Sequence, residues 1–245
     1  MPFELPPSKD RRERPGAALS VLYVTSTEGS TATTGDHPLR PDLAYETLRP
    51  ARMPTAPPTV EPEACAPLAL LELGPARFPA RTGPHGEAAL LEDQDRHRRD
   101  RSAVRRGPAA LGRATATGRG PGPYGLQAAI ATCHTASPST QETDGERVVL
   151  LHEVLGRVAP SPVVELNPAV AVAMANGPRQ ALHMVDELAV SGRLSGSHLL
   201  PGVRGELLTR LGRTTEARAE LELAARPGRN TRERSVLLRK AAALP

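Results

Sequence analysis

The sequence contains no tryptophan and very few other aromatic residues. Five aromatic side chains are spread over 245 residues. Aromatic residues provide the largest individual burials in most protein cores, so a core in this chain has to be built from leucine, valine and alanine. Apolar residues make up 39% of the chain, which is below the usual globular share. We therefore expect a shallow core.

Cysteine and lysine are also scarce. Cys65 and Cys133 are the two cysteines, and they lack the Cys-x-x-Cys spacing of zinc sites. Two isolated thiols are typical of a reduced compartment, so we expect a cytoplasmic protein without a metal or other cofactor. Lysine occurs only at Lys9 and Lys240, and the net charge of +4 comes from arginines interspersed with acidic residues. This charge permits contact with nucleic acid but does not require it.

Long apolar runs are missing as well. The amino terminus, MPFELPPSKDRRERPG, lacks the apolar segment of a signal peptide, and no run approaches the length of a membrane span. The sequence also has no phosphate loop, no dinucleotide-binding glycine motif and no Gly-x-Ser-x-Gly elbow. We expect a non-enzymatic protein that has neither a small-molecule substrate nor a membrane contact.

What the sequence does contain is a succession of helical patterns. After about Gly122, apolar residues recur at steps of three and four, and Asp144 is a predicted N-cap. The series Ala181–Val185–Leu188 recurs as Ala217–Leu221–Ala224, and the two copies lie 35–36 residues apart. This is close to the period of tetratricopeptide-type repeats. We predict an all-α fold, a helical array with tetratricopeptide-like helix pairs in the C-terminal half.

The N-terminal half carries a less regular helical pattern. Helices are predicted over residues 16–30 and 40–52, and a third, interrupted by prolines, over 61–80. Residues 80–96 predict a turn and an extended run, which together form a short hairpin-like segment. An arginine-rich helix is predicted over 96–116.

This difference between the halves predicts two domains, residues 1–121 and 122–245. Eight prolines lie between Pro50 and Pro79, and each removes a backbone hydrogen-bond donor. We therefore expect residues 40–80 to be poorly ordered and the second domain to form a compact helical array.

Two polar clusters could carry chemistry, and each has a simpler explanation. Glu92, Asp93 and Asp95 could bind a metal ion, but no glycine-punctuated calcium loop or suitably placed histidine accompanies them. Salt bridges to nearby arginines are favoured instead. Six arginines between residues 96 and 106 could grip a phosphate backbone, yet no aromatic stacking platform lies among them. A solvated helical face is favoured there, with nucleic-acid binding as an alternative.

Several long motifs resemble one known family. In chain order they are LYVTSTEG, LLEDQDR, GPYGLQAAIATCH, APSPVVELNPAVAVAMANGP and VRGELLTRLGRTTEARAELELA. They are similar to the carboxy-terminal extension of one group of extracytoplasmic-function RNA polymerase sigma factors. That group carries a helical, tetratricopeptide-like extension behind its promoter-binding and polymerase-binding modules. The resemblance covers nearly the whole chain, and the two modules themselves are missing from the sequence.

The resemblance implies a non-enzymatic regulatory and interaction region of a sigma factor, which acts in transcription initiation on the sigma modules or on RNA polymerase. Without the two modules we do not expect direct DNA binding, and we expect a truncated or decaying gene product whose first domain is partly degraded. The alternative is a free-standing helical-repeat adaptor that binds an unrelated protein. The candidate interaction residues lie in LLEDQDR and GPYGLQAAIATCH: Asp93, Gln94, Asp95, Arg96, Tyr124 and Gln127.

The chain departs from the family pattern where large buried side chains are expected. Where the family usually has aromatic residues, this sequence has Ser26, Ser30, Arg99, Gly145 and His152. Pro168 stands where an arginine is usual, within one continuous helix. A proline inside a helix costs about 3 kcal/mol, so Pro168 predicts a helix break or marginal stability. Alternatively, Asn167 caps a shorter helix that begins at Pro168.

Overall fold

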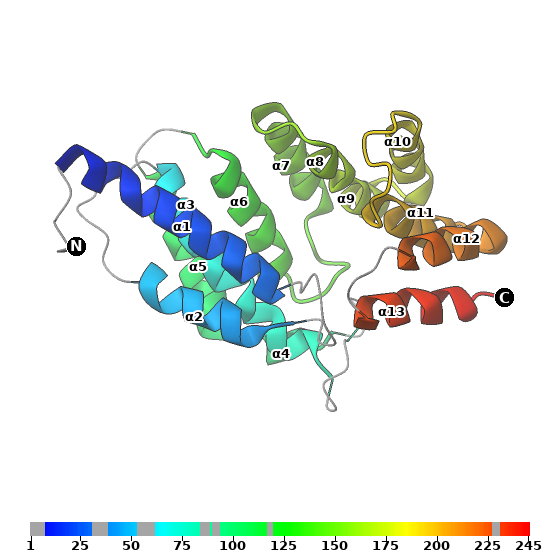
Figure 1. The fold of residues 1–245 in the computed structure, drawn as a ribbon, viewed down its shortest axis with the longest axis horizontal. Helices are drawn as coiled ribbons and strands as arrows, with labels where there is room; N and C mark the ends of the chain where they lie inside the picture. The colour runs from blue at the N-terminus through cyan, green and yellow to red at the C-terminus, as the bar shows by residue number, and fades with distance from the viewer. Residues whose placement is uncertain are drawn as a thin grey trace, which may run out of the picture. The chain divides into compact units, whose positions relative to one another are not determined.

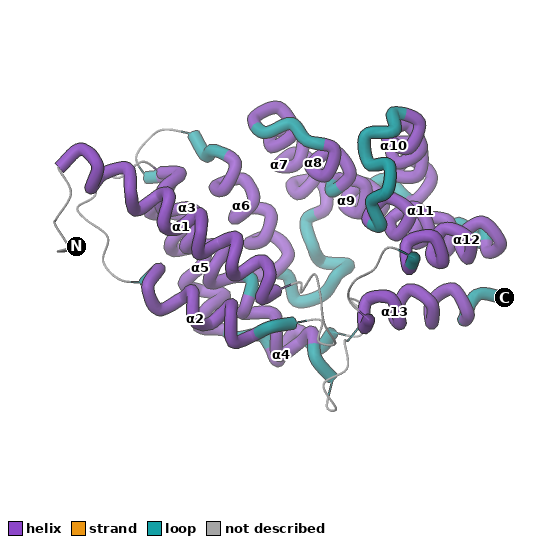
Figure 2. Tube along the Cα trace, in the orientation of Figure 1, coloured by secondary structure: helices purple, strands orange, loops and turns teal. Residues whose placement is uncertain are grey.

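The computed structural model describes residues 8–30, 39–52, 62–83, 89, 94–116, 120–226 and 231–245. These residues form α-helices and short 3₁₀ helices and contain no β-strand, so the predicted all-α class is confirmed (Figures 1 and 2). The described residues divide into two compact units. The N-terminal unit ends at Pro138 and the C-terminal unit begins at Ser139.

The N-terminal unit is built around one central helix. Its elements are α1 (Ser8–Ser30), α2 (Pro41–Ala51), α3 (Pro62–Leu73), η1 (Pro75–Arg77), α4 (Phe78–Arg81), η2 (Arg96–Arg98), α5 (Arg101–Thr115) and α6 (Pro123–Ala136). Helix α3 packs against α1, α5 and α6. Its contact with α5 is close because Gly107 faces Leu73, with buried alanines on either side. Close packing of small residues replaces the missing aromatic core.

The expectation of poor order over residues 40–80 is wrong for the described part of that stretch. Helices α2 and α3 form although Pro50 and Pro67 lie inside them. Leu48 and Leu71 are buried, and burial of a leucine side chain contributes roughly 1.5–3 kcal/mol, which offsets much of the cost of a proline. Pro75, at the first position of η1, has no N–H that the helix would need.

The hairpin-like segment predicted over residues 80–96 lies partly outside the described residues. In the described part, the backbone N–H of Ala89 donates to the carbonyl oxygen of Arg81 at 3.0 Å. After it, Asp95 caps η2 and Asp100 caps α5. The chain then enters the predicted arginine-rich helix, which begins at Arg101.

Helix α6 belongs to the N-terminal unit, so the structural division falls after Pro138 rather than after residue 121. It packs against α3 and α5. Its fully buried Ala128 completes an apolar cluster with Ala69, Leu70 and Ala110 of those two helices. The regularity of the α6 pattern resembles that of the later helices, but its contacts join it to the earlier ones.

The C-terminal unit is a succession of helices in which each packs chiefly on near neighbours in the chain. They are α7 (Gly145–Val158), α8 (Pro162–Leu166), α9 (Pro168–Ala175), α10 (Pro178–Val190), α11 (Leu199–Arg210), α12 (Thr214–Ala225) and α13 (Thr231–Ala242). The contacting pairs run in order from α7 and α9 to α12 and α13 (Figure 1). Such sequential packing is the property of helical repeat arrays.

Local signals in the C-terminal unit act as predicted. The Asp144 side chain accepts a hydrogen bond from the backbone N–H of Arg147 at 2.9 Å and caps α7. Gly177 and Gly212 have φ of 91° and 72°, a conformation that favours glycine, and they end α9 and α11. All six residues of the predicted repeat are buried: Ala181, Val185, Leu188, Ala217, Leu221 and Ala224.

Pro168 divides the segment into α8 and α9, so the predicted helix break is confirmed. Pro168 is the first residue of α9, as in the alternative of a second helix start. Asn167, however, makes no side-chain capping hydrogen bond, and its φ of −57° and ψ of −37° are helical. A residue that precedes proline is disfavoured in this region of backbone conformation. The two helices therefore nearly continue one another across an unfavourable link.

Candidate functional site

Two of the predicted interaction residues join α6 to α1. The rings of Tyr124 and Tyr23 meet edge to face, with centroids 5.5 Å apart. The Tyr23 hydroxyl donates to Oε1 of Gln127 at 3.0 Å. Burial, and secondarily Tyr124, raises the pKa of the Tyr23 hydroxyl, so it remains a donor. Tyr124 and Gln127 thus hold two helices of the N-terminal unit together.

The remaining predicted residues lie around η2, except that Asp93 lies outside the described residues, as does Glu92. Asp95 accepts from the backbone N–H of His97 at 2.9 Å, which is a helix cap rather than the predicted salt bridge. Gln94 donates to the carbonyl oxygen of Ala89 at 3.3 Å. These short-range bonds shape the turn that leads into η2.

Arg96 and Arg99 bind the C-terminal end of α6. Arg96 donates to the carbonyl oxygen of Ser137 at 3.0 Å, and Arg99 donates to that of Thr135 at 2.9 Å. Both also reach the carbonyl oxygen of His134. Cations are favoured at helix C-terminal ends, where carbonyl groups have no partner within the helix.

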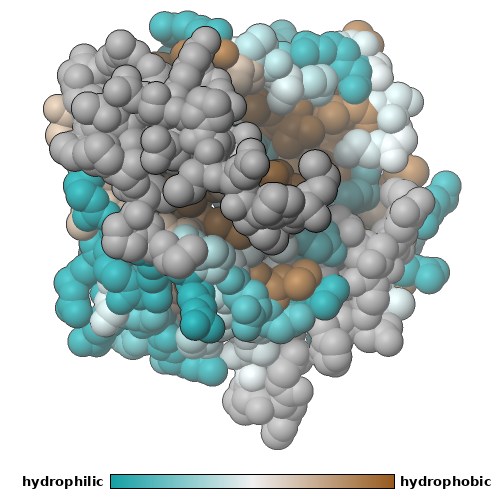
Figure 3. Space-filling model, turned by 60° about the vertical axis from the view of Figure 1, so that its left-hand side comes forward, coloured by the Kyte–Doolittle hydropathy of each residue, from teal (hydrophilic) through white to brown (hydrophobic). Residues whose placement is uncertain are grey.

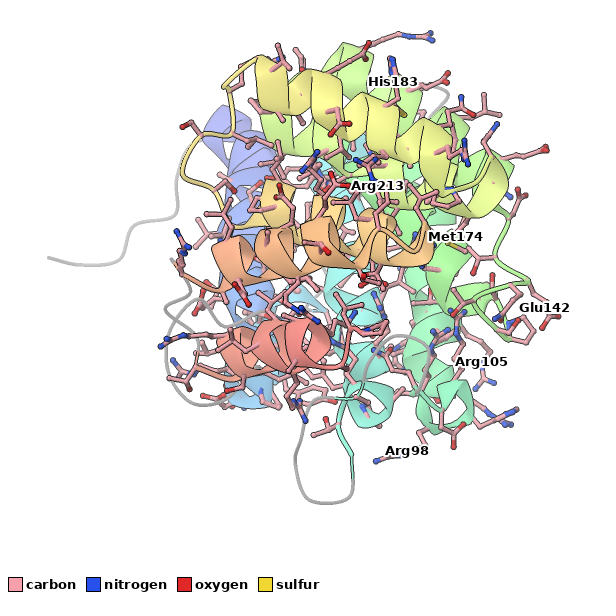
Figure 4. All side chains as sticks on the ribbon, turned by 90° about the vertical axis from the view of Figure 1, so that its right-hand side faces the viewer. Arg98, Arg105, Glu142, Met174, His183 and Arg213 are labelled. Atoms are coloured by element: carbon pink, nitrogen blue, oxygen red, sulfur yellow. The ribbon has the colours of Figure 1, made fainter. Side chains whose placement is uncertain are left out.

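The predicted solvated arginine face is therefore wrong for two of its members. Arg99 is only 7% exposed and Arg96 is half-buried. Burial, and then the nearby Arg96 and Arg77, lowers the pKa of Arg99 to about 10. Arg98 and Arg105 remain exposed, as Figure 4 shows for both. Loss of the inward-facing members weakens the case for nucleic-acid binding.

Arg99 and His152 confirm that their positions are buried ones. Both stand where the resemblance implies an aromatic residue, and His152 is 8% exposed. Arg99 Nε and His152 Nδ1 are buried without a hydrogen-bond partner among the described residues. Ser26 is buried as well, whereas Ser30 and Gly145 are half-buried. The chain has placed polar groups in positions that suit large apolar ones.

A groove between α10, α11 and α12 was not predicted from the sequence. It has a volume of about 820 Å³ and is lined on its apolar side by Val190, Leu194, Leu200 and Leu223. Val190 is 90% exposed and Leu223 is 45% exposed. The signal that could have revealed it is that Leu223 lies off the buried stripe of α12.

Ionic contacts tie the three helices together within this groove. Arg204 of α11 donates from Nε to Asp186 of α10 at 2.7 Å and from Nη1 to Glu220 of α12. These hydrogen bonds, first that to Asp186, raise the pKa of Arg204. With Arg226 at the edge, the lining has two cationic and two anionic side chains. The groove is therefore nearly neutral and largely apolar.

Isolated exposed apolar residues are ordinary on protein surfaces. Figure 3 shows such brown patches among teal polar residues on the face that it presents. The groove differs because its exposed apolar side chains line a concave surface. Grooves of this kind accept the apolar face of a partner helix.

No group of three or more His, Cys, Asp or Glu residues that could hold a metal ion occurs in the described part of the chain. Among the described helices, none has the length and apolar character needed to cross a membrane.

The fold and the groove define a class, an all-α helical array with a surface suited to protein interaction. Residues 14–115 match the model of a family described as "Family of unknown function (DUF6596)". Over 233 residues, 95% of its length, the chain is 40% identical to Uncharacterized protein R00370 of Rhizobium meliloti (strain 1021). The chain spans about half of that relative, 54% of its length.

A solved structure of similar fold is the thermophilic TPR protein TTC0263 of Thermus thermophilus. The similarity covers 95% of this chain and 100% of the other, with a TM-score of 0.49 and 18% sequence identity.

Proposed function

We propose that the chain is a non-enzymatic interaction region whose C-terminal unit holds the apolar face of a partner helix in the groove between α10, α11 and α12. The observation that carries the proposal is the concave apolar surface around Val190 and Leu223. The Arg204 contacts support it, because they hold the three helices in place before a partner arrives. A preorganised groove binds with a smaller loss of conformational entropy.

The partner we propose is the pair of promoter-binding and polymerase-binding modules of an extracytoplasmic-function sigma factor, or RNA polymerase itself. The ordered sequence motifs support this assignment, and they include the segment that forms α11 and α12 of the groove. In this role the chain regulates transcription initiation without touching DNA. The alternative remains an adaptor that binds an unrelated protein through the same groove.

The proposal is tested by measuring the affinity of the full chain for a purified two-module sigma factor and for core RNA polymerase by calorimetry. We expect saturable binding to one of them. The substitutions Val190→Glu and Leu223→Glu place charges in the groove and should each weaken binding at least about tenfold, since each removes the burial of an apolar side chain.

A matched control is Leu150→Glu. Leu150 is 60% exposed on α7 of the same unit and does not line the groove. It should leave the affinity unchanged. If neither purified partner binds, the sigma-factor assignment fails. If a partner binds but the groove variants behave like the control, the groove is not the binding site.

A further inference from the structure

A cavity of about 500 Å³ lies within the N-terminal unit, among α2, α3, η1 and α5. Three arginines line it: Arg49, Arg52 and Arg106. Tyr45 and Leu48 contribute an aromatic and an apolar side chain, and Tyr45 is 47% exposed. The cavity does not involve any of the residues predicted from the sequence to interact with a partner.

A buried carboxylate holds two of these arginines in position. Glu72 is 2% exposed. Arg52 donates to it from Nε and Nη2, both at 2.7 Å, and Arg106 donates from Nε at 3.0 Å. The Nη1 groups of both arginines donate no hydrogen bond to the described residues. Glu72 thus fixes two guanidinium groups side by side and leaves part of each available.

The carboxylates of the cavity are already engaged. Glu72 lies between the two arginines, and Asp100 Oδ1 accepts from the backbone N–H groups of Ser102 and Ala103 at 2.8 Å and 3.0 Å. Arg49 has no hydrogen bond or ion pair with any residue that the structure describes. The cavity therefore has three cationic side chains, two committed anionic ones and an excess of free donors.

We propose that this cavity binds the phosphate group of a small phosphorylated molecule. Guanidinium groups match the oxygen geometry of phosphate, and Glu72 positions two of them in advance. The volume lies within the range of small-molecule sites, which is about 300–1,000 Å³, so it exceeds what a phosphate ion alone requires. The remainder of the ligand then covers Tyr45 and Leu48. This site is independent of the groove in the C-terminal unit.

The test is calorimetric titration of the full chain with inorganic phosphate and with phenyl phosphate, at constant ionic strength maintained with sodium chloride. We expect both to bind and phenyl phosphate to bind more tightly. Arg49→Gln should weaken both at least about tenfold, because a hydrogen bond to a charged group contributes that much or more. Arg49 has no described partner, so its substitution should leave the far-ultraviolet circular dichroism spectrum unchanged.

The matched control is Arg105→Gln, an exposed arginine of α5 that lies outside the cavity (Figure 4). It should retain the affinity of the unaltered chain. The proposal is overturned if neither ligand binds saturably, or if Arg49→Gln has no effect. It is also overturned if Arg105→Gln weakens binding equally, which would show general attraction of anions to a basic surface. Equal affinity for the two ligands would remove the role of Tyr45 and Leu48.

Discussion

The contact between α11 and α12 predicts opposite effects for two glycine substitutions on one helix. A Cβ atom at Gly205 would lie 2.9 Å from Cγ and 3.2 Å from the backbone nitrogen of Leu221. A Cβ atom at Gly202 would meet only the Cβ of Ala224, at 3.9 Å, among described atoms within 4 Å. Gly205→Ala therefore forces the two helices apart, whereas Gly202→Ala fills available space.

The magnitudes follow from two competing effects. Replacing glycine by alanine inside a helix stabilises it by about 1 kcal/mol, and this gain applies at both positions. Overpacking of a close contact costs typically about 1–3 kcal/mol, and this cost applies only at Gly205, because the Leu221 backbone cannot rotate away. We expect Gly202→Ala to raise the free energy of unfolding by about 0.5–1 kcal/mol and Gly205→Ala to lower it by about 1 kcal/mol.

Urea and thermal unfolding followed by far-ultraviolet circular dichroism measure both changes. For a chain of this length, each kcal/mol corresponds to a shift of about 2–4 °C in the melting temperature. The two variants should therefore move in opposite directions from the unaltered protein. The reasoning is refuted if Gly205→Ala is as stable as Gly202→Ala, because the close approach of α11 to Leu221 would then not exist.

Two further substitutions test buried and backbone features of the C-terminal unit. Pro168→Arg supplies the missing N–H between α8 and α9 and should stabilise the protein by about 1–2 kcal/mol in urea unfolding; no gain would show that the break is accepted without cost. Burial lowers the pKa of His152, so the unfolded chain takes up a proton near its ordinary pKa of about 6.5 while the folded protein does not. Stability should therefore fall as the pH decreases below that value, by at most about 1.4 kcal/mol per pH unit. His152→Phe should reduce this slope between about pH 6.5 and about pH 5.5, and an unchanged slope would assign it to other groups.

Features that depend on near neighbours in the chain were predictable from the sequence. Asp144 caps α7, Gly177 and Gly212 end helices, and Pro168 divides a helix. Each of these effects acts within one helical turn, through a missing donor, a capping oxygen or a permitted φ. The buried stripe of α10 was likewise visible as a spacing of apolar residues. Local chemistry alone determined the helical class and most helix ends.

Contacts between residues distant in the chain were decided only by the tertiary structure. The arginine-rich segment placed Arg99 inward, because the end of α6 offers it carbonyl oxygens more than thirty residues away. Glu72 meets Arg52 and Arg106 from two other helices, and no spacing in the sequence indicates that cavity. The groove similarly requires α10, α11 and α12 to converge around Arg204. A sequence pattern gives the face of a helix that is apolar, but the identity of the partner depends on how the helices pack.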